Sequence, residues 1–187
     1  YGETASGYRE EGYFPEAFVN MLALLGWNPG TEQEIFTMDE LIAAFSIDRV
    51  GKSGARFDPD KAKWFNAKYF QAKSDEELAR LFMPVVEEKG FYPDFGKLVK
   101  IISLVKERAG FVRDLWNEAD FFFVAPESYD AEVVRKRWNT DSPRQMTELF
   151  GMVAGVQPFT QEVLETSVKE WISSKGYNTG TILNLFR

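Results

Sequence analysis

Helix start signals recur along this 187-residue sequence, and they constrain its fold more than any other feature. Thr37 and Ser74 are each followed three residues later by glutamate and then by apolar residues, which is the capping-box pattern of a helix N-terminus. Asp58 precedes Pro59, and proline is favoured in the first helical turn. Strand signals are scarce, and only residues 121–124 have a composition compatible with extended backbone. The sequence therefore predicts an all-α fold.

Apolar residues at helical spacing follow these signals and mark out the helices. The clearest amphipathic helix holds Leu98, Ile101, Ile102 and Val105 and is expected to end near Gly110. Further helices are expected to begin at Pro15, after Thr37, at Pro59, after Ser74, after Asp130, at Ser142, after Thr160 and near Thr179. Two of the predicted apolar stripes consist of Phe18, Leu22 and Leu25, and of Trp64, Phe65 and Tyr69.

The sequence contains no cysteine and no histidine, and this excludes several kinds of chemistry. A disulfide, a thiolate zinc site, a cysteine nucleophile and a histidine general base each need one of these residues. A serine triad and the histidine-led metal motifs are excluded for the same reason. Carboxylate, lysine or tyrosine chemistry remains open, as does binding without chemistry.

The composition is that of a chain with a packed core. Hydrophobic residues make up 44% of the sequence and aromatic residues 16%. No apolar stretch reaches the roughly 18–20 residues of a membrane span. The first residues, Tyr1-Gly2-Glu3, lack the basic and apolar regions of a signal peptide. We therefore expect a cytoplasmic protein without a membrane partner.

The net charge of -7 is distributed unevenly along the sequence. Residues 61–115 carry 11 basic and 8 acidic side chains, whereas residues 1–60 and 116–187 are each acidic overall. A local excess of lysine and arginine is the electrostatic footprint of a polyanion-binding surface, although a solvated helix face has the same composition. The run of basic residues in this part comprises Lys89, Lys97, Lys100, Lys106, Arg108 and Arg113.

No residue pattern predicts a catalytic, cofactor or metal site within the chain. Gly-Lys-Ser at residues 51–53 lacks the glycine that a phosphate loop needs five positions earlier, because Ser46 stands there. Asp114 and Glu118 lie one helical turn apart, but two carboxylates without a third ligand make a poor metal site.

Several uncommon residues occur in a specific order. The sequence reads Gly-Tyr-Arg-Glu-Glu-Gly-Tyr-Phe-Pro-Glu-Ala at residues 7–17, Leu-Leu-Gly-Trp at residues 24–27 and Lys-Ser-Gly-Ala at residues 52–55. A Lys-x-x-Trp-x-Asn-x-x-Tyr spacing follows at residues 61–69, and Gly176, Gly180 and Arg187 stand near the C-terminus. In this order the residues resemble the C-terminal portion of bacterial glutamyl-tRNA synthetases, a family of class I aminoacyl-tRNA synthetases. Gly54 stands where that family has proline.

The resemblance implies a particular domain organisation. Residues 1–72 would be a helical stem-contact region, and residues 73–187 would be an α-helical anticodon-binding cage. A further subdivision is expected near residues 125–130, where Pro126 and its neighbours form a turn-rich connection. The family continues with further helices, so the cage is expected to be truncated at its C-terminus.

The resemblance also implies what the chain binds and what it cannot catalyse alone. The full-length protein would be a glutamate–tRNA ligase, with tRNA(Glu) as partner and no DNA partner. Family members activate glutamate with a His-Ile-Gly-His-type motif and a Lys-Met-Ser-Lys-Ser-type loop, and neither occurs in this sequence. ATP and Mg²⁺ are therefore expected only at a catalytic domain outside the chain. The chain alone is expected to be an inactive monomer.

The family further implies which side chains contact tRNA. Lys52, Arg56 and Lys68 take positions that contact the backbone of the tRNA stem. Arg108 stands where the family has an arginine that discriminates an anticodon base, a task suited to the fixed fork of a guanidinium. The second anticodon-contacting element would contain Asn184 and Arg187.

Composition alone leaves a second interpretation open, an all-α protein-interaction module with an incidental basic face. A third interpretation, a free-standing enzyme that uses lysine or tyrosine chemistry, has no supporting residue pattern. Binding of tRNA separates the first two interpretations.

Overall fold

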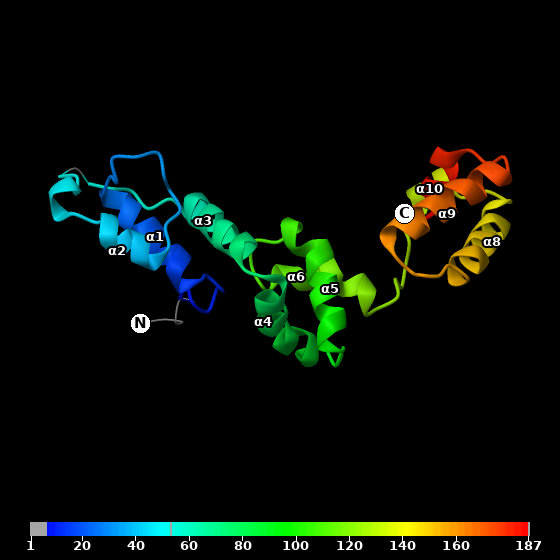
Figure 1. Ribbon diagram of the computed structural model, residues 1–187, viewed down its shortest axis with the longest axis horizontal. Coiled ribbons are helices and arrows are strands. Elements are labelled where there is room, and N and C mark those ends of the chain that lie inside the picture. The colour runs from blue at the N-terminus through cyan, green and yellow to red at the C-terminus, as the bar shows by residue number, and fades with distance from the viewer. Residues whose placement is uncertain (1–6, 53, 187) are drawn as a thin grey trace. The chain divides into compact units, whose positions relative to one another are not determined.

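The computed structural model describes residues 7–52 and 54–186, and the chain divides into two compact units (Figure 1). Unit 1 is Tyr1–Ala125, and unit 2 is Pro126–Arg187. No strand occurs in the described residues, where a single isolated antiparallel bridge joins Trp27 and Val50. The prediction of an all-α fold is therefore confirmed.

The helices follow one another along the chain in both units. In unit 1 they are α1 (Pro15–Gly26), α2 (Met38–Ala44), η1 (Ile47–Arg49), α3 (Pro59–Ala72), α4 (Asp75–Glu88), α5 (Phe95–Val105), η2 (Lys106–Arg108), α6 (Asp114–Ala119) and η3 (Asp120–Phe122). In unit 2 they are α7 (Ala131–Arg137), α8 (Ser142–Ala154), α9 (Gln161–Ser174) and α10 (Thr179–Phe186).

The predicted start signals form real helix caps. Ser74 Oγ accepts a hydrogen bond from Glu77 N at 3.2 Å, and Glu77 Oε2 accepts one from Ser74 N at 2.8 Å. Thr37 and Glu40 form the same reciprocal pair at the start of α2. Such boxes satisfy amide groups that the first helical turn leaves without partners, so α2 and α4 begin where the sequence predicts. At the other end of α9, Gly176 has a φ of 67°, a conformation that favours glycine.

Helix α3 contributes to two hydrophobic clusters of unit 1. Phe65, near its middle, is fully buried in a cluster that includes Met21 of α1. Phe70, near its C-terminus, is fully buried in the larger cluster formed mainly by α4, α5 and α6. Burying one such side chain stabilises a fold by roughly 1.5–3 kcal/mol. Helix α3 therefore holds the two ends of unit 1 together through its own side chains.

Asn66 adds polar contacts at the same place. Its fully buried side chain accepts a hydrogen bond from Phe14 N and donates one to Gly110 O, both at 2.8 Å. Gly110 lies so close to α3 that a Cβ added there would be 3.4 Å from the Cβ of Ala67. Asn66 thus fixes the start of α1 and the segment after η2 against one helix.

The connection between α3 and α4 is also held by side chains. Lys73 Nζ lies 2.8 Å from Glu16 Oε1, and Lys106 Nζ donates a hydrogen bond to Lys73 O. The predicted domain boundary after residue 72 falls at this connection, inside unit 1. The division of tRNA-binding roles at residue 72, and a second one near residues 125–130, stays a prediction.

Unit 2 packs α8, α9 and α10 around a small apolar core. Leu149, Ile172 and Ile182, one from each helix, are the buried residues of this core. Partly buried apolar side chains surround them, including Val168 and Trp171 of α9. Val168 and Trp171 therefore lie on the face of α9 that packs against the core of unit 2.

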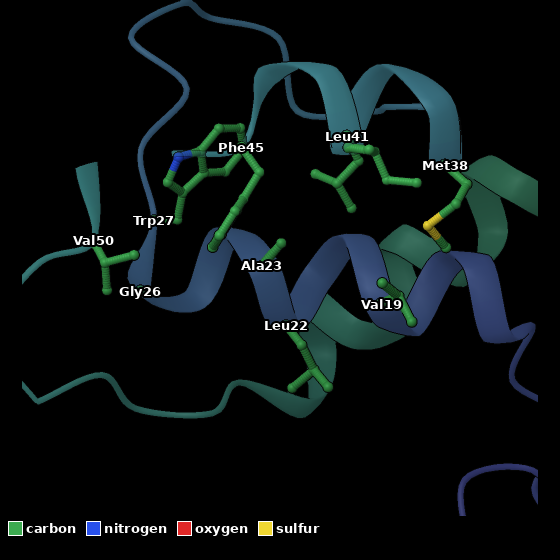
Figure 2. A pocket seen from close by; sticks show the side chains of 10 residues that line it. Val19, Leu22, Ala23, Gly26, Trp27, Met38, Leu41, Phe45 and Val50 are labelled. Carbon is green, nitrogen blue, oxygen red and sulfur yellow. The ribbon is translucent and has the colours of Figure 1, made fainter. Parts of the chain in front are cut away.

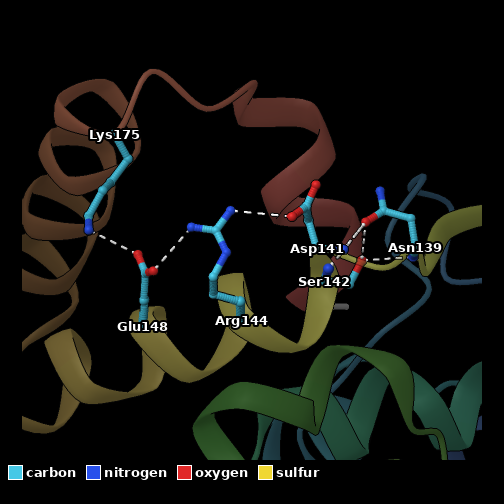
Figure 3. A network of polar contacts seen from close by, with 6 residues as sticks. All are labelled: Asn139, Asp141, Ser142, Arg144, Glu148 and Lys175. Carbon is cyan, nitrogen blue, oxygen red and sulfur yellow. Dashed lines mark hydrogen bonds and ion pairs between the residues drawn. The ribbon is translucent and has the colours of Figure 1, made fainter.

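A chain of ion pairs supplements this core (Figure 3). Arg144 lies 3.3 Å from Asp141 and 3.4 Å from Glu148, and Glu148 also lies 2.9 Å from Lys175, just after α9. The hydrogen bond from Lys175 lowers the pKa of Glu148 below its usual value. Ion pairs at a surface contribute about 0–1 kcal/mol each, so these contacts orient α8 and α9 more than they stabilise them.

Residues 121–124, whose composition is compatible with extended backbone, do not form a strand. Asp120 O accepts hydrogen bonds from Phe123 N and Val124 N, both at 2.8 Å, so the chain turns directly after α6. Phenylalanine favours strands only where a neighbouring strand offers a surface to pack on. The described residues contain no such strand.

Two of the predicted apolar stripes are also partly wrong. Leu22 of α1 is 45% exposed and Trp64 of α3 is 39% exposed, so neither belongs to the core. The buried positions of α1 are instead Ala17, Asn20 and Met21. Helices α1 and α3 pack closely on each other, and small residues permit this approach better than large ones.

Candidate nucleic-acid interface

Lys52 and Arg56 lie in the loop that connects η1 to α3, and both side chains are exposed. Gly51 N donates a hydrogen bond to Gly26 O at 2.7 Å, which anchors the start of this loop to the end of α1. Neither cation forms an ion pair with any residue that the structure describes. Both charges are therefore available to an external anion.

Lys68 lies on the exposed side of α3. Its Nζ is 5.7 Å from the centre of the Trp64 ring, and Trp64 in turn meets the buried ring of Phe65 edge to face. A cation over an aromatic face gains about 0.5–1 kcal/mol at an exposed site. The exposed Trp64 thus orients Lys68, a function that the sequence did not reveal.

Arg108 is the last residue of η2, and its side chain is exposed. The two residues that follow are held firmly, because Ala109 is buried and Gly110 O accepts the hydrogen bond from Asn66. Gly110 packs against Ala67, the neighbour of Lys68 in α3. The segments that carry Lys68 and Arg108 are therefore in direct contact.

The structure removes Lys106 from the basic run found in the sequence. Lys106 is directed inward, with its Nζ 3.3 Å from Asp75 Oδ1. Arg113 lies 4.9 Å from the ring centre of Phe111 and 3.9 Å from Asp114. A lysine that already neutralises a carboxylate adds little to the attraction of a phosphate. Among the other members, four side chains are exposed and form no ion pair with a described residue, namely Lys89, Lys97, Lys100 and Arg108.

In unit 2, Asn184 is an exposed residue of α10. Its Oδ1 accepts a hydrogen bond from Arg137 Nη1 of α7 at 3.0 Å. Arg137 is 47 positions away in the sequence, and no sequence pattern identified it as a site residue. Arg187, the other residue predicted for the second anticodon-contacting element, lies outside the described residues.

An apolar groove of about 660 Å³ lies between α1 and α2 (Figure 2). Trp27 and Phe45 form one end, and Met38 and Val19 the other. The side chains that line the groove are apolar apart from the indole N–H of Trp27, so it offers no cation to a phosphate. The groove is therefore distinct from the basic positions of unit 1.

The shifted pKa values of unit 1 have structural causes. Burial raises the pKa of Tyr69, whose single hydroxyl proton lies within hydrogen-bond reach of two acceptors, Asn20 Oδ1 and Phe36 O. Backbone hydrogen bonds within the capping boxes lower the pKa values of Glu40 and Glu77. Within the described residues, no group of three carboxylates could hold a metal ion, and no helix is long and apolar enough to cross a membrane.

Comparison with known families shows to which class of protein this chain belongs. Residues 77–187 match the family described as anticodon binding domain, and residues 3–64 match the family of class I tRNA synthetases (E and Q), catalytic domain. The first match covers more than half of the sequence. The chain therefore belongs to the anticodon-binding-domain family, and the resemblance to glutamyl-tRNA synthetases is confirmed.

The similar curated proteins are glutamate–tRNA ligases. The chain is 53% identical over 186 residues to the glutamate–tRNA ligase of Bacteroides fragilis and 52% identical to that of Bacteroides thetaiotaomicron. Each alignment covers 100% of this chain and 37% of the relative. The chain thus spans a little over a third of the length of the curated relatives it matches.

The similar solved structures are also those of glutamate–tRNA ligases. The chain superposes with a TM-score of 0.91 and 43% identity on a glutamate tRNA ligase from Elizabethkingia meningosepticum in complex with its amino acid. For glutamate–tRNA synthetase from Elizabethkingia anophelis the TM-score is 0.88 and the identity 40%. Each match covers 98% of this chain and 36% of the solved one. The all-α architecture is therefore that of the matching portion of these enzymes.

Proposed function

We propose that this chain is the tRNA-binding part of a glutamate–tRNA ligase and that it recognises the stem and the anticodon of tRNA(Glu). The match of residues 77–187 to the anticodon binding domain family carries this proposal. The 53% identity to a named glutamate–tRNA ligase supports tRNA(Glu) over other tRNAs. The ATP-dependent ligation would be performed by residues outside this chain, with ATP and Mg²⁺ bound there.

Lys52, Arg56 and Lys68 would bind the phosphate backbone of the tRNA stem. Their exposure and their lack of ion pairs with described residues support this role. Each phosphate contact releases condensed counterions, so such contacts make affinity depend on salt without reading sequence. The three residues would therefore set the strength of binding and the orientation of the tRNA.

Arg108 would read one anticodon base. Exposed bases of an RNA loop are recognised by stacking and by hydrogen bonds to their edges, and a guanidinium presents paired donors to such an edge. The anchored position of Gly110 on α3 supports this role, because it restricts where the Arg108 side chain can reach. Asn184 and Arg187 would belong to a second anticodon-contacting element in unit 2.

The net charge of -7 does not prevent this binding. The Debye length is about 8 Å at physiological salt, so distant carboxylates have little effect on a local cluster of cations. The acidic side chains outnumber the basic ones mainly in residues 1–60, whereas residues 61–115 are basic overall. The protein would act in the cytoplasm, where tRNA charging takes place, and would bind tRNA as a monomer.

The proposal is tested by titrating the chain with labelled tRNA(Glu) and with an unrelated tRNA at two salt concentrations. We expect tighter binding of tRNA(Glu) and weaker binding of both RNAs at the higher salt concentration. Equal and negligible binding of both at low salt would contradict the proposal and favour a protein-interaction module. In the same samples, the chain alone should form neither glutamyl-adenylate nor glutamyl-tRNA.

A further inference from the structure

The short turn that carries Arg108 is held on both sides. Arg108 is the last residue of η2, a single 3₁₀ turn in which Ala109 N donates a hydrogen bond to Lys106 O at 3.2 Å. Two positions after Arg108, Gly110 O accepts the hydrogen bond from Asn66. Two positions before Arg108, the Lys106 side chain is directed inward and is only 20% exposed. The contacts of Lys106 therefore determine how the beginning of this turn is held.

Lys106 binds the corner between α3 and α4. Its Nζ donates a hydrogen bond to the carbonyl oxygen of Lys73, the residue that ends α3. The same Nζ lies 3.3 Å from Oδ1 of Asp75, the first residue of α4. A carbonyl at the end of a helix lacks a partner within that helix, and an ammonium group has three donors, so both acceptors are satisfied at once. Lys106 thus joins the turn of η2 to two helices.

The corner between α3 and α4 is in turn fixed to α1. Lys73 Nζ lies 2.8 Å from Glu16 Oε1 and 4.4 Å from the ring centre of Phe14. The carboxylate of Glu16 and the ring of Phe14 both attract the ammonium group, the first as an ion pair and the second through the face of its π system. The acceptors that hold Lys106 are therefore themselves held in place.

These contacts connect the two family matches of the chain. Glu16 lies in residues 3–64, which match the catalytic-domain family, and Lys106 lies in residues 77–187, which match the anticodon binding domain. Lys73 lies between the two matches and contacts a residue of each. Two successive contacts therefore join one family match to the other.

Stability alone does not account for an inward lysine at this position. The side chains of Lys106 and Asp75 are 20% and 32% exposed, and an ion pair near the surface adds little to the free energy of unfolding. Val105 and Ala109, on either side of η2, are buried in the same hydrophobic cluster and already hold the backbone to the core. Apolar packing is not directional, whereas hydrogen bonds are. The contacts of Lys106 therefore add a defined orientation to a turn that is already anchored.

We propose that Lys106 is a positioning residue for anticodon recognition. By binding the corner between α3 and α4, it fixes the turn of η2 and with it the direction in which the exposed Arg108 reaches the RNA. The ammonium group of Lys106 is engaged with Lys73 O and Asp75, so Lys106 acts on the RNA only through Arg108. A side chain whose backbone is fixed beforehand loses less freedom on binding. The inference rests on the proposed function and deepens it.

The test measures a ratio of affinities that a general loss of folded protein leaves unchanged. The chain and its Lys106→Met variant are each titrated with labelled tRNA(Glu) and with an anticodon-swapped tRNA. Methionine keeps the apolar stem of lysine and removes its ammonium group. We expect Lys106→Met to reduce the ratio of the two affinities by at least about threefold, as for residues coupled in one hydrogen-bond network.

Lys97→Met is the matched control, because it removes the same charge from an exposed lysine of α5. It should leave the ratio of the two affinities unchanged. An unchanged ratio in Lys106→Met would overturn the inference. Equal reductions in Lys106→Met and Lys97→Met would also overturn it, since they would indicate a general electrostatic effect.

A double substitution tests whether Lys106 acts through Arg108. In an Arg108→Ala background, Lys106→Met should have no further effect on the ratio, because the side chain that it positions is gone. A further reduction of the same size would contradict the inference. Asp75→Asn weakens the same contact, so it should also reduce the ratio, and it supplies the result if circular dichroism shows that Lys106→Met unfolds. An unchanged ratio in Asp75→Asn would then overturn the inference.

These outcomes separate the inference from the proposed function. If the unmodified chain prefers tRNA(Glu), and Arg108→Ala loses this preference while Lys106→Met retains it, the inference alone is overturned. If Arg108→Ala retains the preference, the proposed role of Arg108 and the inference are both wrong. No binding of either RNA by the unmodified chain would overturn the proposed function as a whole and the inference with it.

Discussion

The buried side chain of Asn66 donates a hydrogen bond to the carbonyl oxygen of Gly110 across 2.8 Å. Its Oδ1 accepts a second hydrogen bond from Phe14 N, so one amide joins three segments of unit 1. Because Arg108 lies two positions before Gly110, the proposed base-reading arginine depends on this contact for its position. The hydrogen bond between Asn66 and Gly110 therefore helps to position Arg108.

We expect Asn66→Ala to destabilise unit 1 by about 2–4 kcal/mol. The substitution leaves a backbone donor and a backbone acceptor without partners, and each costs about 1–3 kcal/mol when buried. The midpoint of urea unfolding measures the change. Asn117→Ala is the matched control, because Asn117 is exposed on α6, and it should change the free energy of unfolding by less than about 0.5 kcal/mol. Equal effects of the two substitutions would contradict the assigned role of Asn66.

Glu16 makes the stability of unit 1 depend on pH. Burial raises the pKa of its carboxyl, but the hydrogen bond from Lys73 and a backbone hydrogen bond outweigh burial, so the pKa lies below the usual 4.5. A carboxyl whose pKa is lowered by folding stabilises the folded state above the unfolded pKa, and this contribution is lost as the pH falls through the folded pKa. Glu16→Gln should therefore reduce the loss of stability below pH 4.5 in urea unfolding. If the free energy of unfolding of the unmodified chain and of Glu16→Gln falls equally with falling pH, Glu16 does not contribute to the acid dependence.

Arg108→Ala should reduce discrimination between anticodons. If the guanidinium makes a bidentate contact with a base edge, the difference in binding free energy between tRNA(Glu) and an anticodon-swapped tRNA should shrink by about 1–3 kcal/mol. Titration of both RNAs measures this difference. Lys100→Ala removes an exposed positive charge from the neighbouring α5 and should leave the difference unchanged. A uniform loss of affinity for both RNAs in Arg108→Ala would assign Arg108 to the backbone instead.

Lys52→Ala should weaken the binding of both RNAs by about the same factor. Lys52 is exposed in a loop and is proposed to contact phosphate, which carries no sequence information. The slope of log affinity against log salt should become less steep by about one. The same titrations at several salt concentrations measure both quantities. A selective loss for tRNA(Glu), with an unchanged slope, would contradict the backbone role of Lys52.

Much of the fold follows from the local sequence. The capping boxes at Thr37 and Ser74 start helices because their side chains satisfy neighbouring backbone amides, an effect that needs no tertiary contact. The stripe at Leu98, Ile101 and Val105 is buried as expected. The phenylalanines at residues 121–123 did not predict their structure, because strand preference depends on a partner strand.

The candidate site is less accessible to sequence reasoning, because it depends on contacts between distant residues. The composition of residues 61–115 indicated a basic region, but only the structure distinguishes the inward Lys106 from the exposed Arg108. Arg137 and Asn184 are separated by 47 positions, and nothing in either local sequence links them. Trp64 has the spacing of a core residue, yet it lies beside Lys68 at the surface.

We propose that these helices bind the anticodon arm of tRNA(Glu) while the ligation chemistry resides elsewhere. The most direct measurement compares the affinity of the chain for the isolated anticodon stem–loop of tRNA(Glu) with that for an acceptor-stem hairpin of the same tRNA. We predict clear binding of the anticodon stem–loop and weaker binding of the acceptor hairpin. Tighter binding of the acceptor hairpin, or no binding of the anticodon stem–loop at low salt, would contradict the claim.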